Sequence, residues 1–294
     1  MQDDKNSEYP KGVWGKGFEE RYKQWDKEGR PTRPSPQEIE IYRRFLGPLS
    51  REKKILILGP TPELRDLVAG YPVVVTDMSL SNIHEATKYL TQANAVEETH
   101  VENDWLSLPF PRGFFDLILG DIVLNQFMPG EQEKKFLQVI KKLCTPEGRF
   151  ISRFIFLDPS FTSQNLGGKL KRITRDTSFS RGEKVFLIAN AALCCTAEHA
   201  LRLNNLYFSW TMLEYLLASG DFDYFTRGLI GDAIKYLKEN GFPGGRWWSY
   251  PMEADLLNLV SAYFKILQKD YASDNGGGKL FSILYCVPKV SVDT

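Results

Sequence analysis

The chain has 294 residues, of which 43% are hydrophobic, and this is ample for a large packed core. Lys plus Arg and Asp plus Glu number 37 each, so the formal net charge is zero, and no overall basic field would gather nucleic acid or an anionic membrane. The amino terminus is polar, and the longest apolar stretch, near residues 185–197, is interrupted by Asn190 and too short to span a bilayer. These properties predict a soluble, globular, cytoplasmic protein without a membrane partner.

Cysteine and histidine usage argues against a metal centre. The four cysteines show no C-x-x-C spacing, and the adjacent pair would point in different directions on a helix. Three histidines are too few for a histidine-rich metal site, and they make a Ser-His-Asp arrangement hard to assemble. We therefore expect reduced packing cysteines and no metal site. The residues concerned are Cys144, Cys194, Cys195, Cys286, His84, His100 and His199.

Two helices are predicted in an N-terminal extension, residues 1–50. Four aromatic residues recur at helical spacing before a Gly-Arg-Pro break: Trp14, Phe18, Tyr22 and Trp25. This aromatic face either packs on the domain or forms a lid over the mouth of a binding crevice. A second helix, Gln37–Leu46, follows, with Ser35 or a neighbour as its cap and Gly47-Pro48 as its stop.

Residues 54–77 read as strand, turn, helix and strand. Ile55–Leu58 is a short apolar run, typical of a strand buried on both faces of a parallel sheet, and Gly59 lets the backbone turn sharply. Val73–Thr76 is β-branched, which favours a second strand. Asp77 then falls at the carboxyl end of that strand, where doubly wound sheets place the carboxylate that holds a ribose diol.

The turn after the first strand is not a dinucleotide fingerprint. G-x-G-x-x-G needs a second glycine where a pyrophosphate approaches the backbone, and Thr61 stands there. A nucleoside without phosphates would suffer less, which favours S-adenosylmethionine (SAM) over NAD or FAD. The order of motifs resembles the class I SAM-dependent methyltransferases, in particular a variant whose first loop reads L-G-x-T-P-E-L, over roughly residues 35–157 and 252–288. An ordinary strand-turn-helix with a capping Asp is the alternative.

The candidate cofactor contacts in this half of the crevice share one edge of the predicted sheet: Gly59, Pro60, Thr61, Glu63, Asp77 and Met78. A helix is predicted over Ser81–Ala93, and Val96–Val101 reads as a weak strand or a loop. In class I methyltransferases an acidic residue after the third strand accepts a hydrogen bond from the adenine amino group, beside an apolar side chain that covers the ring. The resemblance gives these roles to Asp104 and Trp105. An exposed loop acid beside a core tryptophan is the alternative.

Phe114–Asp121 reads as the fourth strand, and its Phe-Asp pair also resembles the family. Its end places Gly120 and Asp121 at the edge of the cofactor or at the doorway for the substrate. Met128–Leu143 is predicted as the next helix and Arg149–Phe156 as the fifth strand. The alternation of strands and helices implies a parallel sheet.

A long segment, residues 158–251, then interrupts the expected order. Residues 166–184, rich in Gly, Ser, Lys and Arg, read as a mobile loop. The helices predicted after this loop are Lys184–Leu201, Tyr207–Ala218 and Arg227–Asn240. The chain returns with a helix and two strands that resemble the antiparallel sixth and seventh strands of the methyltransferase sheet: Glu253–Ala262, Tyr263–Tyr271 and Leu280–Val287.

The predicted fold is α/β: a Rossmann-like, doubly wound, seven-stranded, mostly parallel sheet with a C-terminal antiparallel hairpin, plus a helical insertion. Residues 51–157 and 252–294 form the SAM-binding core, and residues 158–251 form a helical cap inserted after the fifth strand.

The leading hypothesis for function is a SAM-dependent methyltransferase acting on a small or medium-sized molecule. Methyl transfer from a sulfonium is a direct displacement, so positioning supplies much of the rate and a general base is optional. Asp121 is the candidate base. Arg153, near the end of the fifth strand, is either a partner for a substrate carboxylate or a surface arginine.

Three alternatives stay open. The missing glycine argues against an NAD-dependent oxidoreductase, and an inactive Rossmann-like binding module would bind no SAM. Nucleic-acid methylation is disfavoured, because the chain lacks both an Asp/Asn-Pro-Pro-aromatic signature after the fourth strand and a Pro-Cys pair. One basic cluster either binds a phosphate backbone or is a solvated loop: Lys169, Lys171, Arg172, Arg175, Arg181 and Lys184.

Overall fold

The computed structural model describes residues 33–92, 97–127, 129–157, 164–196, 203–240, 247–249, 251–274 and 278–289, together with Tyr22, Trp25 and Ser160. The predicted aromatic helix of the N-terminal extension lies outside the described residues, apart from Tyr22 and Trp25. These two rings stack at a centroid distance of 5.2 Å. Within the described part of the chain, no helix is long and apolar enough to cross a membrane.

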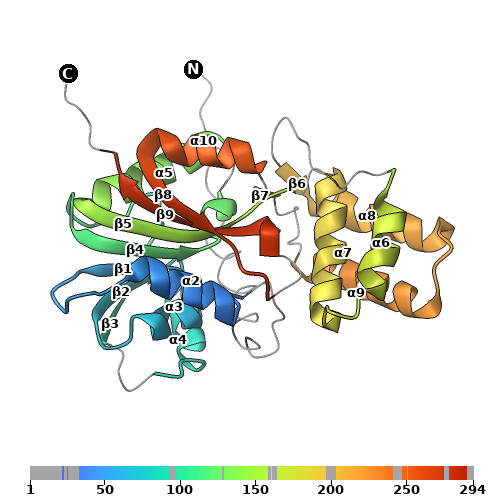
Figure 1. Cartoon of the computed structure of the whole chain (residues 1–294), viewed down its shortest axis with the longest axis horizontal. Coiled ribbons are helices and arrows are strands. Elements are labelled where there is room, and N and C mark those ends of the chain that lie inside the picture. The colour runs from blue at the N-terminus through green and yellow to red at the C-terminus, as the bar shows by residue number, and fades with distance from the viewer. Residues whose placement is uncertain are drawn as a thin grey trace.

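A seven-stranded sheet forms the centre of the molecule (Figure 1). Its strand order is β3-β2-β1-β4-β5-β9-β8, with the first five strands parallel and β9 antiparallel to both of its neighbours. The strands are β1 (Ile55–Leu58), β2 (Pro72–Asp77), β3 (Glu97–Glu102), β4 (Phe115–Asp121), β5 (Cys144–Ile155), β8 (Phe264–Asp270) and β9 (Phe281–Pro288). The doubly wound sheet and the C-terminal hairpin predicted from the sequence are therefore confirmed.

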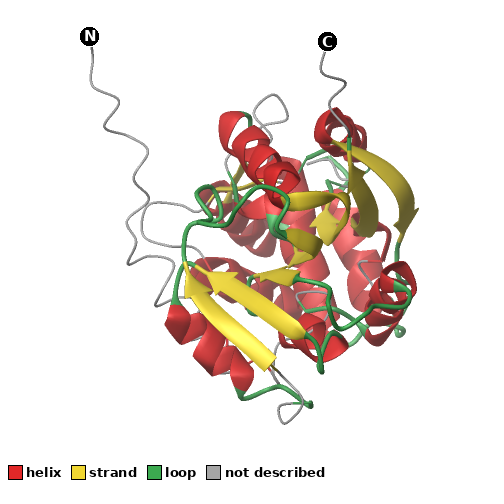
Figure 2. Ribbon diagram, turned by 90° about the vertical axis from the view of Figure 1, so that its left-hand side faces the viewer, coloured by secondary structure: helices red, strands yellow, loops and turns green. Residues whose placement is uncertain are grey.

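Helices cover both faces of the sheet (Figure 2). One face carries α2 (Pro36–Leu46), α3 (Pro62–Leu67) and α4 (Leu80–Thr87), which pack with alternate residues of β1, β2 and β4. The other face carries α5 (Glu131–Leu143) and α10 (Glu253–Tyr263). Strands such as Ile55–Leu58 are buried on both sides, as parallel sheets require.

A separate group of helices lies beyond β5, at the right of Figure 1. Its members are α6 (Leu166–Arg175), α7 (Arg181–Thr196), α8 (Leu206–Ser219) and α9 (Tyr224–Asn240), with a small antiparallel pair, β6 (Leu203–Asn205) and β7 (Trp247–Ser249). These helices share one apolar cluster, which also takes in Ile155 and Phe281 of the sheet and Leu157 just after β5. We call α6 to α9 the cap.

The prediction of a mobile loop over residues 166–184 is wrong, because most of this segment is helical in α6 and the start of α7. Leu166, Leu170 and Thr174 are buried at a spacing of four, so one face of α6 packs in the cap. The paired glycines and the cations lie on the rest of the helix. Burial of that face therefore outweighs the low helix propensity of glycine.

Two element boundaries also differ from the predictions. α4 ends at Thr87 rather than at residue 93, because the carboxylate of Asp66 accepts the backbone N–H groups of Thr91 and Gln92 and turns the chain. β5 begins at Cys144, where the strand pairs with Phe115 before a bulge. The segment from Cys144 to Gly148, which precedes the predicted strand Arg149–Phe156, is thus part of the strand.

Candidate functional site

The carboxyl ends of β1, β2 and β4 meet at one edge of the sheet, where doubly wound folds bind their ligands. Gly59, Asp77 and Asp121 stand at these three ends, one on each strand, as the sequence predicts. We call this region the crevice edge. The residues that surround it come from α2, α3, β5 and the segment after β4.

Gly59 makes the turn from β1 into α3 with a φ of 83°, a left-handed value that favours glycine. Its N–H donates to the carbonyl of Thr76 at 2.8 Å, which ties the end of β1 to β2. Thr61 occupies the N-cap position of α3 but its hydroxyl makes no capping hydrogen bond. Pro60 and Thr61 are both buried, so the turn presents backbone rather than long side chains at the edge.

Asp77 ends β2 with its carboxylate largely enclosed. Oδ1 accepts hydrogen bonds from Ser79 N–H at 3.0 Å and from Asn82 Nδ2 at 2.9 Å. Burial raises the pKa of Asp77 to about 6, although these hydrogen bonds act in the opposite direction. Met78 follows it, half-buried. Asp77 therefore has hydrogen-bond donors but no cationic partner among the described residues.

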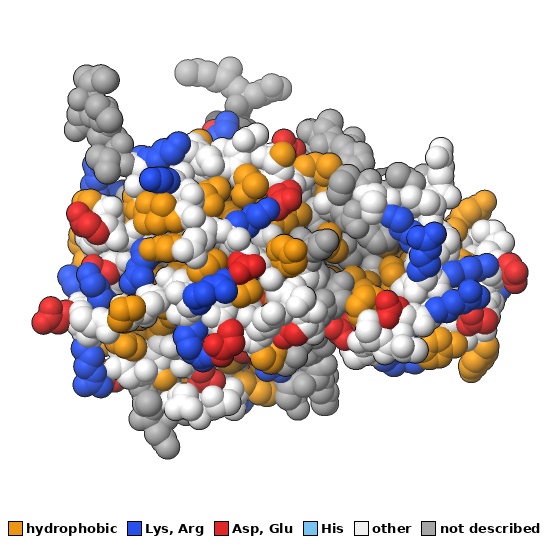
Figure 3. Space-filling view, in the orientation of Figure 1, with side chains coloured by type: hydrophobic (Ala, Val, Ile, Leu, Met, Phe, Trp, Pro, Cys, Tyr) orange, Lys and Arg blue, Asp and Glu red, His pale blue; other side chains and the backbone are white. Residues whose placement is uncertain are grey.

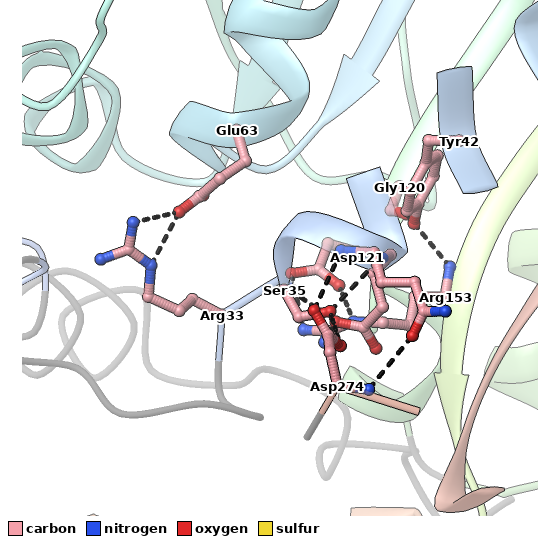
Figure 4. A network of polar contacts seen from close by, with 10 residues as sticks. Arg33, Ser35, Tyr42, Glu63, Gly120, Asp121, Arg153 and Asp274 are labelled. Carbon is pink, nitrogen blue, oxygen red and sulfur yellow. Dashed lines mark hydrogen bonds and ion pairs between the residues drawn. The ribbon is translucent and has the colours of Figure 1, made fainter. Parts of the chain in front are cut away.

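Glu63, in the first turn of α3, is held from one side only (Figure 4). Its Oε1 accepts from Arg33 Nε at 2.8 Å and from Trp25 Nε1 at 3.2 Å. Oε2 is buried and has no hydrogen-bond partner. Burial raises the pKa of Glu63, because the neighbouring guanidinium only partly offsets the loss of water. The carboxylate thus keeps one acceptor atom available.

Asp104 and Trp105 lie in the loop between β3 and β4. The carboxylate of Asp104 is exposed and accepts the N–H of Leu106 at 2.9 Å. The indole of Trp105 donates to the carbonyl of Thr76 at 3.1 Å and packs edge-on to Phe127. A Cβ built on Gly59 would lie 3.7 Å from this indole. The ring therefore fills space between the ends of β1 and β2, and its described contacts are with protein groups.

Arg153 does not face solvent, as a surface arginine would. Its side chain is 0% exposed and pairs with two carboxylates: Nε with Asp121 Oδ1 at 2.6 Å, and Nη1 with Glu38 Oε2 at 2.7 Å. Nη2 donates a further hydrogen bond to Asp121 Oδ2 at 3.2 Å. Burial acts to lower the pKa of Arg153, but the charges of Asp121 and Glu38 outweigh it and raise the pKa. The guanidinium of Arg153 and both oxygens of Asp121 are therefore engaged in ion pairs inside the protein.

Tyr42 and Glu38 of α2 are functional-site neighbours that the sequence reasoning missed. The Tyr42 hydroxyl donates to Gly120 O at 2.6 Å and accepts from Arg153 N–H at 2.8 Å, so it bridges β4 and β5. Glu38 also closes the capping box of α2 with Ser35, whose hydroxyl in turn bonds Asp274 at 2.6 Å (Figure 4). The S-x-x-E spacing from Ser35 was the sequence signal that marked Glu38.

The segment after β4 contains one strained residue and is held to β5 by hydrogen bonds. Among the described residues, Ile122 is the one non-glycine with a positive φ, 58°, which is costly for a β-branched side chain. Its N–H bonds the carbonyl of Arg153 at 2.9 Å. Asn125 pairs with both backbone groups of Ile155, at 3.0 and 3.1 Å. These bonds hold the side chain of Ile122 against the apolar cluster of the cap.

The described residues contain no group of His, Cys, Asp and Glu placed to hold a metal ion. The cysteines are free thiols, and Cys144, Cys194 and Cys286 are buried. Burial raises the pKa of Cys144 and Cys286 to about 12, so these thiols stay protonated at neutral pH. The crevice edge offers backbone groups, carboxylates and an amide, which suit an organic ligand.

Comparisons with known proteins agree with this geometry. Residues 59–152 match the family model described as a methyltransferase domain. A comparison with curated protein sequences finds no significant match. Two solved structures share the fold at low sequence identity, and neither likeness says more than that.

The first is a Rhodobacter sphaeroides protein described as a zinc-dependent alcohol dehydrogenase, 16% identical, with a TM-score of 0.56 and coverage of 94% of this chain and 100% of the other. The second is the 1,6-didemethyltoxoflavin-N1-methyltransferase of Burkholderia thailandensis, solved with its substrate and S-adenosylhomocysteine (SAH). It is 12% identical, with a TM-score of 0.52 and coverage of 95% and 87%. The matched residues, 59–152, run from the Gly59 turn through Asp77 to β5, so the part of the chain that holds the crevice edge is similar to a methyltransferase domain.

Proposed function

We propose that this protein transfers a methyl group from SAM to a small or medium-sized organic acceptor. The observation that carries the proposal is the crevice edge itself: the Gly59 turn and the enclosed carboxylate of Asp77 lie at adjacent strand ends within the segment that matches the methyltransferase domain. SAM supplies an electrophilic methyl group on a sulfonium, so the protein needs chiefly to hold donor and acceptor in line.

Different residues of the crevice edge contact different parts of SAM. Asp77 Oδ2 accepts from the ribose hydroxyls, while Ser79 and Asn82 hold Oδ1 and fix the carboxylate in place. The Gly59–Glu63 turn receives the amino-acid end, where the unpartnered Oε2 of Glu63 suits an ammonium group. Asp104 and Trp105 border the adenine end, Asp104 through an exposed carboxylate and Trp105 as a packed wall.

The acceptor binds where the segment after β4 meets the cap. Ile122 projects into the apolar cluster that joins the two, and Phe186 of α7 lies 5.7 Å from Phe281 of β9 at the same junction. Strain at a single residue beside a ligand edge is typical of a functional site. We propose that Asp121 acts as an anchor rather than as a base, because Arg153 holds both of its oxygens. Direct displacement at a methyl group does not require a base.

Charges on the cap support a small acceptor over a nucleic acid. Lys and Arg side chains of the cap stand among acidic ones on the face shown at the right of Figure 3. Lys184 is buried and donates to Thr174 O at 2.9 Å, and Arg181 pairs with Asp232 at 2.5 Å. Only part of the predicted basic cluster is thus exposed for a phosphate backbone.

Calorimetry with SAM and SAH tests the donor site. Charged hydrogen bonds of the kind proposed for Asp77 are worth about 1.5–3 kcal/mol, so Asp77→Ala should weaken binding about tenfold to a hundredfold. A matched variant, Asp66→Ala, removes a carboxylate that turns the chain after α4 and should bind SAM as the wild type does. An unchanged dissociation constant in Asp77→Ala would remove the ribose assignment, and NADH binding in place of SAM would favour the oxidoreductase alternative.

A further inference from the structure

We infer that the crevice edge discriminates by charge, and that it holds the sulfonium donor SAM in preference to the product SAH. The inference rests on the proposed function, because it concerns the ligand of the same crevice. It is drawn from a surplus of enclosed carboxylate groups over cations among the residues that the structure describes at this edge.

The first part of the surplus is the cluster around Arg153. One guanidinium faces two carboxylates, and the three side chains of Arg153, Glu38 and Asp121 are 0%, 0% and 5% exposed. Enclosed ionic groups normally balance their charges, since an uncompensated charge is costly away from water. Here the cluster carries a net negative charge, and Glu38 Oε1 has no hydrogen-bond partner.

The second part lies on α3 and β2. Arg33 and Trp25 both reach Oε1 of Glu63, so Oε2 of that carboxylate is enclosed without a donor. Asp77 accepts from an amide and a backbone N–H, which bring no positive charge. The buried and half-buried charged groups of the described residues at this edge are therefore four carboxylates and two guanidiniums: Glu38, Glu63, Asp77, Asp121, Arg33 and Arg153. The exposed acids Glu102 and Asp104 have the same negative sign.

A ligand with one additional positive charge balances the surplus of carboxylates better than a ligand without that charge. SAM carries its sulfonium in addition to the ammonium and carboxylate that it shares with SAH. For any two unit charges on the order of 10 Å apart, Coulomb's law with an effective permittivity of about 20–40 corresponds to roughly a four- to fifteenfold change in affinity. The product then leaves readily, because methyl transfer removes the charge that the edge attracts.

The variant Glu38→Gln removes one charge with little change in shape. Gln serves at this position of a capping box, and its carbonyl can still accept from Arg153. The matched control is Glu98→Gln, which neutralises a buried carboxylate of β3 that is paired with Arg65 at 2.5 Å and with His100 at 2.8 Å. Each variant loses a buried negative charge next to a buried arginine, but only the first of them, Glu38→Gln, changes the crevice edge.

Calorimetry with SAM, SAH and sinefungin, which carries an amine in place of the sulfonium, measures the effect. We expect the wild type to bind SAM and sinefungin about tenfold more tightly than SAH. Glu38→Gln should weaken SAM about fivefold and SAH less than twofold, while Glu98→Gln keeps the wild-type ratio. Thermal unfolding of each variant confirms that it is folded, and Asp121→Asn, which removes the other carboxylate charge beside Arg153, carries the same expectation if Glu38→Gln does not fold.

Binding of both ligands with SAH at least as tight as SAM would overturn the inference and leave the donor site standing. An equal loss for SAM and SAH in Glu38→Gln would also overturn it, because a purely structural role for Glu38 predicts that result. Binding of neither ligand to the wild type would instead contradict the proposed function.

Discussion

Asp77 shows how one residue couples the crevice to folding. Burial raises its pKa from 3.8 to about 6, so the folded state holds this proton more tightly than the unfolded state. Ionising Asp77 therefore costs the folded state more, and its contribution to the free energy of unfolding falls as pH rises from about 4 to about 6.

We predict that the free energy of unfolding of the wild type, minus that of Asp77→Asn, decreases across this interval and is constant above pH 7. The amide keeps the shape but cannot ionise. Urea denaturation at half-unit pH steps measures the difference. A difference that stays flat or rises from pH 4 to 6 would show that Asp77 is not enclosed in the way described.

The described contacts of Trp105 are ring packing and a hydrogen bond within the protein. Its indole covers Gly59, bonds the carbonyl of Thr76 and contacts Phe127. We predict that Trp105→Ala lowers the free energy of unfolding by about 3 kcal/mol, and that Trp105→Phe lowers it by about 1 kcal/mol, since the ring is kept and one hydrogen bond is lost. Urea denaturation tests both, and a Trp105→Ala variant as stable as the wild type would contradict the packing role.

At the scale of elements, the sequence predicts structure well where local rules decide. The strand, turn and helix around Gly59 follow from apolar runs, a left-handed glycine and a proline at the first helical position, all within a few residues. α6 was missed because its glycines and cations suggested a loop, although its buried positions recur at helical spacing. The composition of this segment led to the wrong prediction of a loop, whereas the helical spacing of its apolar residues would have predicted the helix.

α6 therefore provides a test of the cap as an element. Leu170 is 0% exposed in the cap cluster, and Leu→Ala changes in cores cost about 2–5 kcal/mol. We predict that Leu170→Ala lowers the melting temperature while the dissociation constant for SAM stays unchanged, since the crevice edge lies on the sheet. Leu267→Ala, at a side chain 43% exposed on β8, is the control and should change neither quantity. A loss of SAM affinity in Leu170→Ala would show that cap and crevice fold as one unit.

At the scale of the whole molecule, the site could be predicted only in part. Each strand end could be placed from its own apolar run, so Gly59, Asp77 and Asp121 were found singly. The cluster of Glu38, Asp121 and Arg153 could not be, because Glu38 and Arg153 are 115 positions apart and meet only once α2 packs across β4 and β5. No short sequence pattern predicts a contact between residues so far apart in the chain. Arg153 was accordingly expected at the surface or at a substrate, and it lies instead in the protein interior.

The class of the acceptor also depends on the whole molecule. A nucleic-acid acceptor would need exposed cations on the cap, and these cations can be removed by mutation. Arg172 and Arg175 of α6 are exposed and Lys171 is half-buried, whereas Lys184 is buried against Thr174 and cannot meet a ligand. Replacing these three of the four α6 cations by Gln therefore removes much of the exposed charge of the basic cluster, without disturbing the buried contact of Lys184.

We predict that Lys171→Gln, Arg172→Gln and Arg175→Gln, combined in one variant, leave the dissociation constant for SAM and the turnover of a neutral small acceptor unchanged. Fluorescence anisotropy with RNA and DNA oligonucleotides, at about 50 and 200 mM salt, should show no specific binding by the wild type. A nucleic-acid acceptor would behave differently, since binding through several phosphates loses about 10³–10⁵ in affinity over that interval and weakens with each cation removed. Salt-sensitive binding that disappears in the triple variant would overturn the small-molecule acceptor and turn the cap into a nucleic-acid surface.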